Sequence, residues 1–322
     1  MNRRIFLRKS FLLNSGFWLG RKYALAGSNA KAKVVIAQNP AVVNRHQVQS
    51  DQLLALLDKA MQTYFDCDNP LQAWQKVVQP DEVIGLKVNC LSGAGSTHRE
   101  LVDAVVERLK EAGIKPYNII IWDRLNKDLE ECKFQIRSRG RQVKCFGNDL
   151  AGFHPRLQVF GQAGSLVSRI VTDYCDGIIN LPVLRDHSIA GISVALKNMF
   201  GAIHNPNKYH LNTGDPYIAD VNAFPVFRKK IRLTIVDALE AQYHGGPAFQ
   251  PQWRWPFAGL IVGQDRVAID RIAWQIIEEK RKQKGLPPLK QENREPHYII
   301  TAGDAEHRLG FVHKEKIETI YL

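Results

Sequence analysis

The sequence has no apolar run of the roughly 18 residues that a membrane-spanning helix needs, so we expect no stable membrane span. Its five cysteines include no Cys-x-x-Cys pair. This absence argues against a zinc ribbon and against a ferredoxin-type iron–sulfur cluster, because both gather thiolates at such spacings. The odd number of cysteines argues against a complete disulfide framework, and a single bridge stays open for an oxidising compartment.

A strong basic surface is also missing once the first residues are set aside. The formal net charge is +12, but residues 1–26 hold six basic residues and no acidic one. The rest keeps 38 of the 44 Lys and Arg against 32 Asp and Glu, a net charge of +6. No basic groove with interleaved aromatic residues stands out, so we expect no nucleic-acid partner.

Residues 1–26 predict a targeting segment. Residues 2–6 (Asn-Arg-Arg-Ile-Phe) resemble the twin-arginine export signal, in which two arginines precede a hydrophobic pair. A short apolar stretch follows at 11–20, and the Ala-Leu-Ala of 24–26 fits a small-x-small cleavage site. We therefore expect the twin-arginine machinery to export the chain to the periplasm, or to the thylakoid lumen if the source has thylakoids. The competing interpretation is a basic amphipathic helix of a cytosolic protein.

Strand-like apolar runs alternate with helical patterns through the rest of the chain. The expected strands are 34–37, 83–88, 118–122, 143–146, 177–182, 233–237 and 259–262. The expected helices are 50–65, 98–112, 125–138, 166–174, 194–200 and 267–282. Continuous aliphatic strands between helices are typical of a parallel sheet covered on both faces. We predict an α/β protein of two Rossmann-like lobes with mostly parallel sheets and a cleft between them, in one domain over 27–322 with a soft boundary near 150–165.

Chemically capable side chains concentrate between His187 and His210. This segment holds three imidazoles and the amine of Lys197, beside the small residues Gly191 and Ser193. Imidazoles change charge near neutral pH, so they can bind a metal or move protons. A lysine in an otherwise apolar helix either reaches solvent or points into a site, where it can lose its proton and become a nucleophile. We predict that His187 and Lys197 are catalytic.

Two further histidines are candidate metal ligands. His204 and His210 flank an Asn-Pro-Asn loop, and loops held by a rigid scaffold often carry ligands. Their spacing fixes no coordination geometry, so the prediction is weaker than one from a metal-binding motif. Asp237 ends an expected strand, which is where ligand crevices form in open α/β sheets.

The loop 93–100 follows an expected strand and opens a helix. Its glycines allow close approach, and a helix N-terminus attracts anions. Thr97-x-x-Glu100 also matches a capping box, so structural capping and anion binding both stay open. The loop lacks the third glycine of a dinucleotide fingerprint and the Gly-Lys-Ser/Thr of a P-loop. We predict that Thr97, His98 and Arg99, together with Asn198, bind an anionic group of a substrate.

Two more aspartates have predicted places near helices. Asp265 is expected to be the N-cap of the helix that follows it. Asp304 and His307 are expected in a C-terminal helix, where they pack against the site or cap a turn.

The chain resembles the family called domain of unknown function 362. The segments that carry the resemblance are 81–89, 179–182, 187–201 with its Ala-Leu-Lys-Asn-Met-Phe-Gly core, 234–238 and 265–270. Together they cover nearly the whole chain after the targeting segment. Many relatives carry ferredoxin-like cysteine modules, which this chain lacks.

A more distant resemblance concerns the nickel-pincer lactate racemases. The pattern His187-x-x-Ala-Gly-x-Ser-x-x-x-Lys197 is similar to their segment with a catalytic histidine and the lysine that tethers the cofactor. The resemblance implies a nickel-binding histidine downstream, for which His204 or His210 would serve. The chain departs from the racemases at residues 194–196, where Val-Ala-Leu replaces Gly-Gly-Arg, and after Arg99, where the proline is missing.

Two classes of function stay open. The first is an exported enzyme, racemase-like or an oxidoreductase, whose acid/base or cofactor-assisted chemistry acts on a small anionic, hydroxy-acid-like molecule. A metal ion such as nickel or iron, or an organic cofactor tethered to Lys197, would assist it. The alternative is a non-catalytic accessory protein that binds a metal or cofactor. Both depend on Lys197 and His187 facing one cavity.

Overall fold

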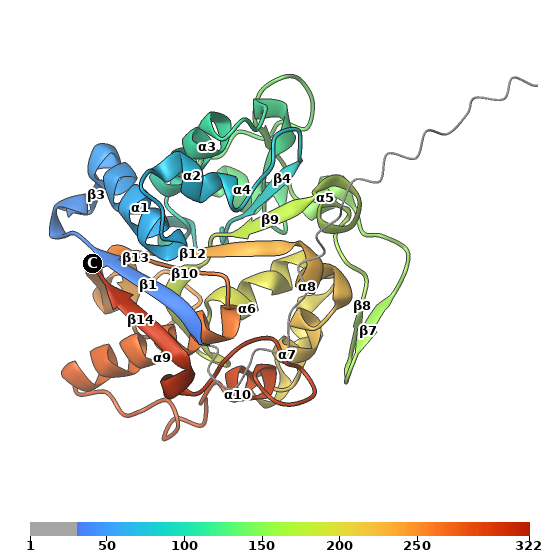
Figure 1. Ribbon diagram of the computed structural model, residues 1–322. Helices are drawn as coiled ribbons and strands as arrows, with labels where there is room; N and C mark the ends of the chain where they lie inside the picture. Colours follow the sequence, from blue (N-terminus) through green and yellow to red (C-terminus); the bar gives the residue numbers. More distant parts are fainter. Residues whose placement is uncertain (1–30) are drawn as a thin grey trace, which may run out of the picture. The chain divides into compact units, whose positions relative to one another are not determined.

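A ten-stranded mixed sheet runs through the computed structural model, which describes residues 31–322 (Figure 1). The twin-arginine-type segment lies outside the described residues. The strands follow the order β14-β1-β13-β12-β9-β4-β5-β6, with β10 paired to β12 and β11 to β10. Their bounds are β1 Ala32–Gln38, β4 Ile84–Lys87, β5 Ile119–Trp122, β6 Lys144–Cys145, β9 Gly177–Asn180, β10 Val183–His187, β11 Gly191–Ile192, β12 Ile231–Gln242, β13 Arg254–Gly263 and β14 Ile317–Tyr321. Two small hairpins are separate, β2 Val43–Asn44 with β3 Gln47–Val48, and β7 Gln158–Phe160 with β8 Ala163–Ser165.

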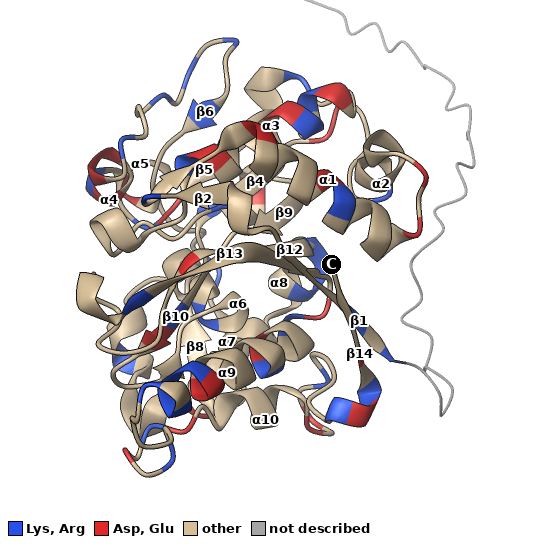
Figure 2. Cartoon of the chain, turned by 90° about the vertical axis from the view of Figure 1, so that its left-hand side faces the viewer, with Lys and Arg blue, Asp and Glu red and all other residues tan. Residues whose placement is uncertain are grey.

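Helices cover both faces of this sheet. Their bounds are α1 Ser50–Phe65, α2 Pro70–Gln75, α3 Arg99–Glu111, α4 Asn126–Glu131, α5 Asn148–Ala151, α6 Ala195–Asn198, α7 Tyr217–Asn222, α8 Pro225–Lys230, α9 Arg266–Gln283 and α10 Tyr298–Ala302. Figure 2 shows α1, α2 and α3 on one side of β12 and β13, and α9 and α10 on the other. None of the helices within residues 31–322 has the length and apolar character needed to cross a bilayer.

The sequence of β1 shows why the sheet is buried on both faces. Val34 and Ile36 pack into the core beneath α9 and α10, whereas Val35 and Ala37 pack into the core beneath α1, α2 and α3. Successive side chains of a strand point to opposite faces, so a strand between two helical layers is apolar at every position. The continuous aliphatic runs of the sequence follow from this arrangement.

The predicted α/β class is confirmed. From β12 through β9, β4, β5 and β6 every pairing is parallel, whereas β12, β13 and β1 pair antiparallel. The strands expected from the sequence all belong to the one main sheet, and residues 31–322 form one compact unit.

Several predicted elements differ in extent from the structure. The helix expected over 125–138 ends at Glu131, because Lys133 takes a left-handed conformation with φ 62°. The stretch 166–174 is helical only as a single π-helical turn at Ile170–Tyr174. Helix α10 ends at Ala302, so the placement of Asp304 and His307 in a C-terminal helix was wrong.

Candidate active site

A cavity of about 400 Å³ lies at the carboxyl ends of the parallel strands β4 and β5 and along β10. Ligand sites of open α/β sheets form at such strand ends. The side chains that line it come from these strands and the loops that follow them, from α6 and from the segment that follows α6. They include Lys87, Asn89, Leu91, Asp123, Arg185, His187, Ile189, Lys197, Asn198, Phe200 and His210.

Helix α6 carries Lys197, and buried polar side chains hold this four-residue helix in place. The carboxylate of Asp270 in α9 accepts hydrogen bonds from the backbone amides of Ala195 and Leu196, at 2.6 and 3.1 Å. Asn180 in β9 and Asn222 in α7 donate to the carbonyl oxygens of the same two residues. A four-residue helix has little stability of its own, so these bonds fix the position of the amine.

The Lys197 amine is buried in the cavity wall, with 8% of the residue exposed. Its Nζ lies 2.9 Å from Nε2 of His210 and 4.9 Å from the centre of the Phe200 ring. Among residues 31–322, no carboxylate lies within ion-pair distance of it. Burial, reinforced by the positive charge of Arg185, lowers the pKa of Lys197 to about 7. Near neutral pH the Lys197 amine is therefore uncharged, with a free electron pair, in a large fraction of the molecules.

His210 has its two ring nitrogens in different roles. Nδ1 lies 3.3 Å from the carbonyl oxygen of Asn207, which can only accept a hydrogen bond. In the neutral ring the proton therefore belongs on Nδ1, and Nε2 accepts from the Lys197 amine. Burial and then the charge of Lys197 lower the pKa of His210 below its ordinary value. The two groups form a pair in which either nitrogen can take a proton from the other.

His187 stacks on His210, with ring centres 5.6 Å apart and planes 21° apart. Its Nδ1 accepts hydrogen bonds from the backbone amides of Ile189 and Ala190 at 3.2 and 3.1 Å. Burial first, and then the charge of Lys197, lowers the pKa of this ring to about 2. His187 is therefore neutral with its proton on Nε2, which suits donation to a ligand oxygen better than removal of a proton.

A second buried lysine lies in the same cavity, paired with a carboxylate. Lys87 Nζ contacts Asp123 Oδ1 at 2.6 Å and the carbonyl oxygen of Val88 at 2.5 Å. Asn198 Oδ1 accepts from Lys87 at 3.3 Å and from Asn89 at 3.1 Å. Asn198 therefore links β4 to α6, one residue after the reactive amine.

Gly201 makes room for this ion pair. A Cβ at this position would lie 2.7 Å from Lys87 Cε and 2.9 Å from Asp123 Oδ1. The Ala-Leu-Lys-Asn-Met-Phe-Gly run thus ends on glycine because a larger residue would displace the pair from the cavity wall.

Arg185 adds a second buried cation without a carboxylate contact. It donates to Asn89 Oδ1 at 2.8 Å and to the Ser92 hydroxyl, while its Nε has no hydrogen-bond partner within residues 31–322. Burial lowers the pKa of Arg185 to about 10, so it stays charged at neutral pH. An unpaired buried charge is unfavourable, and a bound anion would offset it.

Three of the four residues predicted to bind an anion, Thr97, His98 and Arg99, lie outside the cavity lining. Arg99 projects from α3 to Asp103 and to the carbonyl oxygen of Lys133, away from the cavity. The Thr97 hydroxyl accepts from the amide of Asn89 and donates to the carbonyl of Leu181. The N-cap of α3 is His98 without a side-chain cap bond, so the capping box does not form. Of the predicted substrate ligands, Asn198 alone lines the cavity.

The two predicted metal ligands are not brought together on one site. His210 faces Lys197, whereas the ring of His204 packs edge-on against Phe153 at 5.2 Å. No group of three or more His, Cys, Asp or Glu side chains in the described part of the chain is arranged to hold a metal ion. His204 and His210 therefore do not form one metal site together, and we assign no step to a metal.

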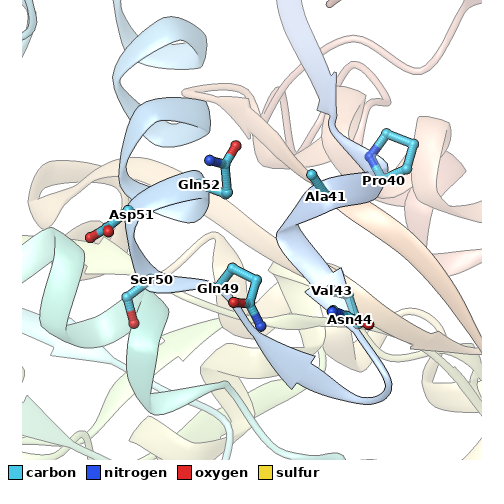
Figure 3. A pocket seen from close by; sticks show the side chains of 8 residues that line it. All are labelled: Pro40, Ala41, Val43, Asn44, Gln49, Ser50, Asp51 and Gln52. Atoms are coloured by element: carbon cyan, nitrogen blue, oxygen red, sulfur yellow. The ribbon is translucent and has the colours of Figure 1, made fainter.

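Asp265 accepts from the Ala268 amide at 2.9 Å, which confirms it as the N-cap of α9. Asp237 lies at the amide of His98 rather than in the cavity. A second hollow between the segment after β1, the β2–β3 hairpin and the start of α1 is lined by three small apolar residues and five polar or charged ones (Figure 3). Its only charged lining residue is Asp51, so it offers no convergent chemistry.

Sequence reasoning missed Lys87, Asp123 and Arg185. Each of the three could have been noticed in the sequence as a charged residue within or directly after an apolar strand. Such a residue is either exposed at the edge of the sheet or buried with a hydrogen-bond or ion-pair partner. Lys87 stands in Ile-Gly-Leu-Lys-Val, and Asp123 follows Ile-Ile-Ile-Trp. Pairing these two signals required knowing that β4 and β5 are neighbours, which the sequence alone does not state.

Fold and site together define an α/β protein with a buried lysine–histidine pair at the ends of its parallel strands. The chain belongs to the family described as domain of unknown function (DUF362), whose model matches residues 84–275. That segment runs from β4 into α9 and holds every cavity side chain named above. The family resemblance is thereby confirmed, and the resemblance to lactate racemases stays a prediction.

No curated protein matches the chain. Among solved structures, it is similar to the crystal structure of a Thermotoga maritima protein from a structural genomics consortium, with 12% sequence identity and a TM-score of 0.40. The match covers 73% of this chain and 59% of that one, so it spans less than two thirds of the other protein.

Proposed function

We propose that the chain is an enzyme that carries out acid/base chemistry on a small anionic, hydroxy-acid-like molecule bound in the 400 Å³ cavity. The observation that carries the proposal is the 2.9 Å contact between the Lys197 amine and His210, beneath the stacked ring of His187. A buried amine with a pKa of about 7 serves as an acceptor and donor of protons near neutral pH, where general acid/base catalysis is most effective.

Each neighbouring group has a role that its bonding supports. Arg185 supplies the positive charge for a carboxylate, since its Nε is unpartnered within residues 31–322. His187 donates its Nε2 proton to a ligand oxygen, because its Nδ1 is held by two backbone amides. Lys197 and His210 exchange a proton with the substrate carbon or hydroxyl. Asn198 and Lys87 keep the wall of the cavity in place.

The test is exchange of the α-hydrogen of 2-hydroxy acids in D₂O, followed by NMR. We expect the wild type to exchange at least one member of a panel of such acids, and His210→Asn to lose about 10²-fold or more in rate. His204→Asn is the matched control, because this histidine lies in the same loop but packs on Phe153. Exchange that survives His210→Asn and Lys197→Arg unchanged would remove the proposal. Binding without any turnover would favour the alternative, a non-catalytic accessory protein.

Export is the second part of the proposal, and it rests on the sequence of residues 1–26. Arg3 and Arg4 followed by Ile-Phe match the signal that the twin-arginine machinery reads. Cell fractionation tests it: we expect the wild type outside the cytoplasm and the Arg3→Lys/Arg4→Lys double variant inside. Equal distribution of the two would contradict export by this route.

A further inference from the structure

Two buried lysines share one cavity and differ in what their amines contact. Lys87 Nζ contacts three oxygen atoms, including a carboxylate oxygen of Asp123 at 2.6 Å. Lys197 Nζ has one hydrogen-bond partner, a ring nitrogen of His210, and no carboxylate among residues 31–322. An ammonium ion is stable at the first position, where its charge is paired, and unfavourable at the second.

The single partner of Lys197 leaves its electron pair available. Because His210 carries its proton on Nδ1, toward Asn207, its Nε2 accepts a proton of the Lys197 amine. An amine that donates to Nε2 keeps its electron pair for the cavity. Burial and Arg185, which lower the pKa of Lys197 to about 7, keep this form populated at neutral pH.

The other side chains that line the cavity indicate which chemical groups a ligand bound next to the amine can have. His187 lines the cavity, and because Nδ1 of its ring accepts from the backbone, its Nε2–H is left as a donor suited to a carbonyl oxygen. Arg185 offers positive charge for a carboxylate. Leu91 and Ile189, which are 60% and 46% exposed, line the cavity and give a short apolar chain a place.

We propose that Lys197 forms an imine with the carbonyl carbon of a small 2-oxo acid held in this cavity. The inference rests on the proposed function, since it takes the same cavity to bind a small anion, and it names a covalent step. The lysine nitrogen bonds to the carbonyl carbon, and the electron pair of the C=O bond moves to oxygen.

The step is balanced without an external reactant. His210 Nε2 takes one proton from the attacking nitrogen and returns it to the former carbonyl oxygen, which His187 holds by its Nε2–H. The second nitrogen proton goes to the same oxygen, and the oxygen leaves as water. One amine and one carbonyl thus give one imine and one water.

The experiment treats the wild-type protein with pyruvate and sodium cyanoborohydride, which reduces imines to stable amines, and locates the added mass by peptide mapping. We expect one adduct, on Lys197, formed roughly 10²-fold faster at pH 7 than on Lys127, because an ordinary lysine is almost fully protonated there. Lys127 is a suitable reference because its side chain is 81% exposed. Acetone, which lacks the carboxylate, should label Lys197 at least about tenfold more slowly than pyruvate.

Mapping on the wild type keeps the test independent of any variant that fails to fold, and Lys197→Arg should abolish the adduct. Labelling of Lys87 or Lys127 at the same rate as Lys197, or no adduct on Lys197, would overturn the imine. Calorimetric titration with lactate, which has no carbonyl group to react, separates this outcome from failure of the proposed function. Lactate binding without pyruvate trapping rejects the imine alone, and absence of both rejects the imine together with the small-anion site.

Discussion

The carboxylate of Asp237 accepts a hydrogen bond from the backbone amide of His98 at 2.7 Å and contacts Nδ1 of the same residue at 2.9 Å. His98 is the N-cap of α3, so the protein itself supplies the anion at this helix N-terminus. Against the effect of burial, Asp237 first and then Glu240 raise the pKa of His98 to about 10. The loop 93–100 was expected to take a substrate anion, and its most favourable position is already filled.

Removing that carboxylate should create an anion site. In Asp237→Asn the α3 N-terminus loses its carboxylate and a positively charged His98 keeps only the longer contact with Glu240 at 3.9 Å, so we expect unfolding free energy at pH 7 to fall by roughly 2 kcal/mol. Sulfate should restore part of this loss relative to chloride at equal ionic strength, as followed by urea unfolding. Asp103→Asn on the same helix is the control, since its exposed carboxylate pairs with Arg99 alone among the residues that the structure describes. An equal response of both variants to sulfate would contradict the assignment.

The stability conferred by the Asp237–His98 contact should also depend on pH. Because the pKa of folded His98 is raised from 6.5 to about 10, the stabilisation is fully present below pH 6.5 and is lost as the pH rises through 10. The difference in unfolding free energy between wild type and Asp237→Asn should therefore shrink between pH 7 and pH 10. A difference that is constant over this range would show that His98 does not carry the charge.

Substitution can distinguish the roles of the two ring nitrogens of His187, the Nδ1 acceptor of the turn and the Nε2 donor in the cavity. Asparagine places its side-chain oxygen near the position of Nδ1, so His187→Asn should keep the turn at Ile189 and Ala190 and remove the donor in the cavity. We expect an unfolding free energy within about 1 kcal/mol of wild type and a lactate affinity about tenfold weaker. His187→Ala should lose both the turn and the donor. Calorimetry and urea unfolding measure the two effects, and full lactate affinity in His187→Asn would contradict the donor role.

Long amphipathic elements could be predicted from the sequence, and contacts between distant elements could not. Helix α1 was predicted to its last residue, because Leu53, Leu56 and Leu57 recur at helical spacing and pack into the core. The antiparallel pairing of β12 with β13 gives no local signal, since both are apolar runs like the parallel strands. Strand β14 also escaped prediction, because only two of its five residues are strongly apolar.

The same distinction between local patterns and distant contacts applies to the candidate site. Lys197, His187 and His210 lie within two dozen residues of sequence, and the structure brings them to one cavity. Arg185 and Lys87 come from strands that are far apart in sequence and are joined through Asn89 and Asn198. Nothing local distinguishes His204 from His210, since which ring faces the cavity depends on the turns between them.

Gly201 should not tolerate a side chain. The Cβ of Gly201→Ala would lie 2.7 Å from Lys87 Cε and force the Lys87–Asp123 pair to move, at a cost of roughly 1–3 kcal/mol in unfolding free energy. Gly164→Ala is the control, because its Cβ would meet no atom closer than 3.6 Å. Thermal unfolding compares the two variants. Equal stability would mean that the cavity wall adapts without cost, contrary to the tight contact of Gly201 with the Lys87–Asp123 pair.

Asp270 should hold Lys197 in place from a distance. Asp270→Ala leaves the amides of Ala195 and Leu196 without acceptors, so we expect a loss of roughly 2–4 kcal/mol in unfolding free energy. Because the amine then leaves its position beside His210, cyanoborohydride trapping of pyruvate should fall as well. Asp270→Asn keeps one acceptor and should regain part of both properties. Trapping at the wild-type rate in a folded Asp270→Ala protein would show that the amine is positioned by other contacts.

A further pH dependence should come from Lys197 itself. Its pKa is lowered from 10.5 to about 7 by folding, so the unfolded chain binds more protons between these values and stability rises with pH across that window. Lys197→Met removes the free-energy cost of burying a charged amine. We expect the unfolding free energy of this variant to exceed that of the wild type by on the order of 4 kcal/mol at pH 6, and the difference to shrink toward pH 10. Lys87→Met should do the opposite and destabilise at every pH, because it leaves Asp123 without its cation. Urea unfolding at pH 6, 8 and 10 compares the three proteins, and a Lys197→Met variant less stable than wild type at pH 6 would mean that the buried amine has a charged partner.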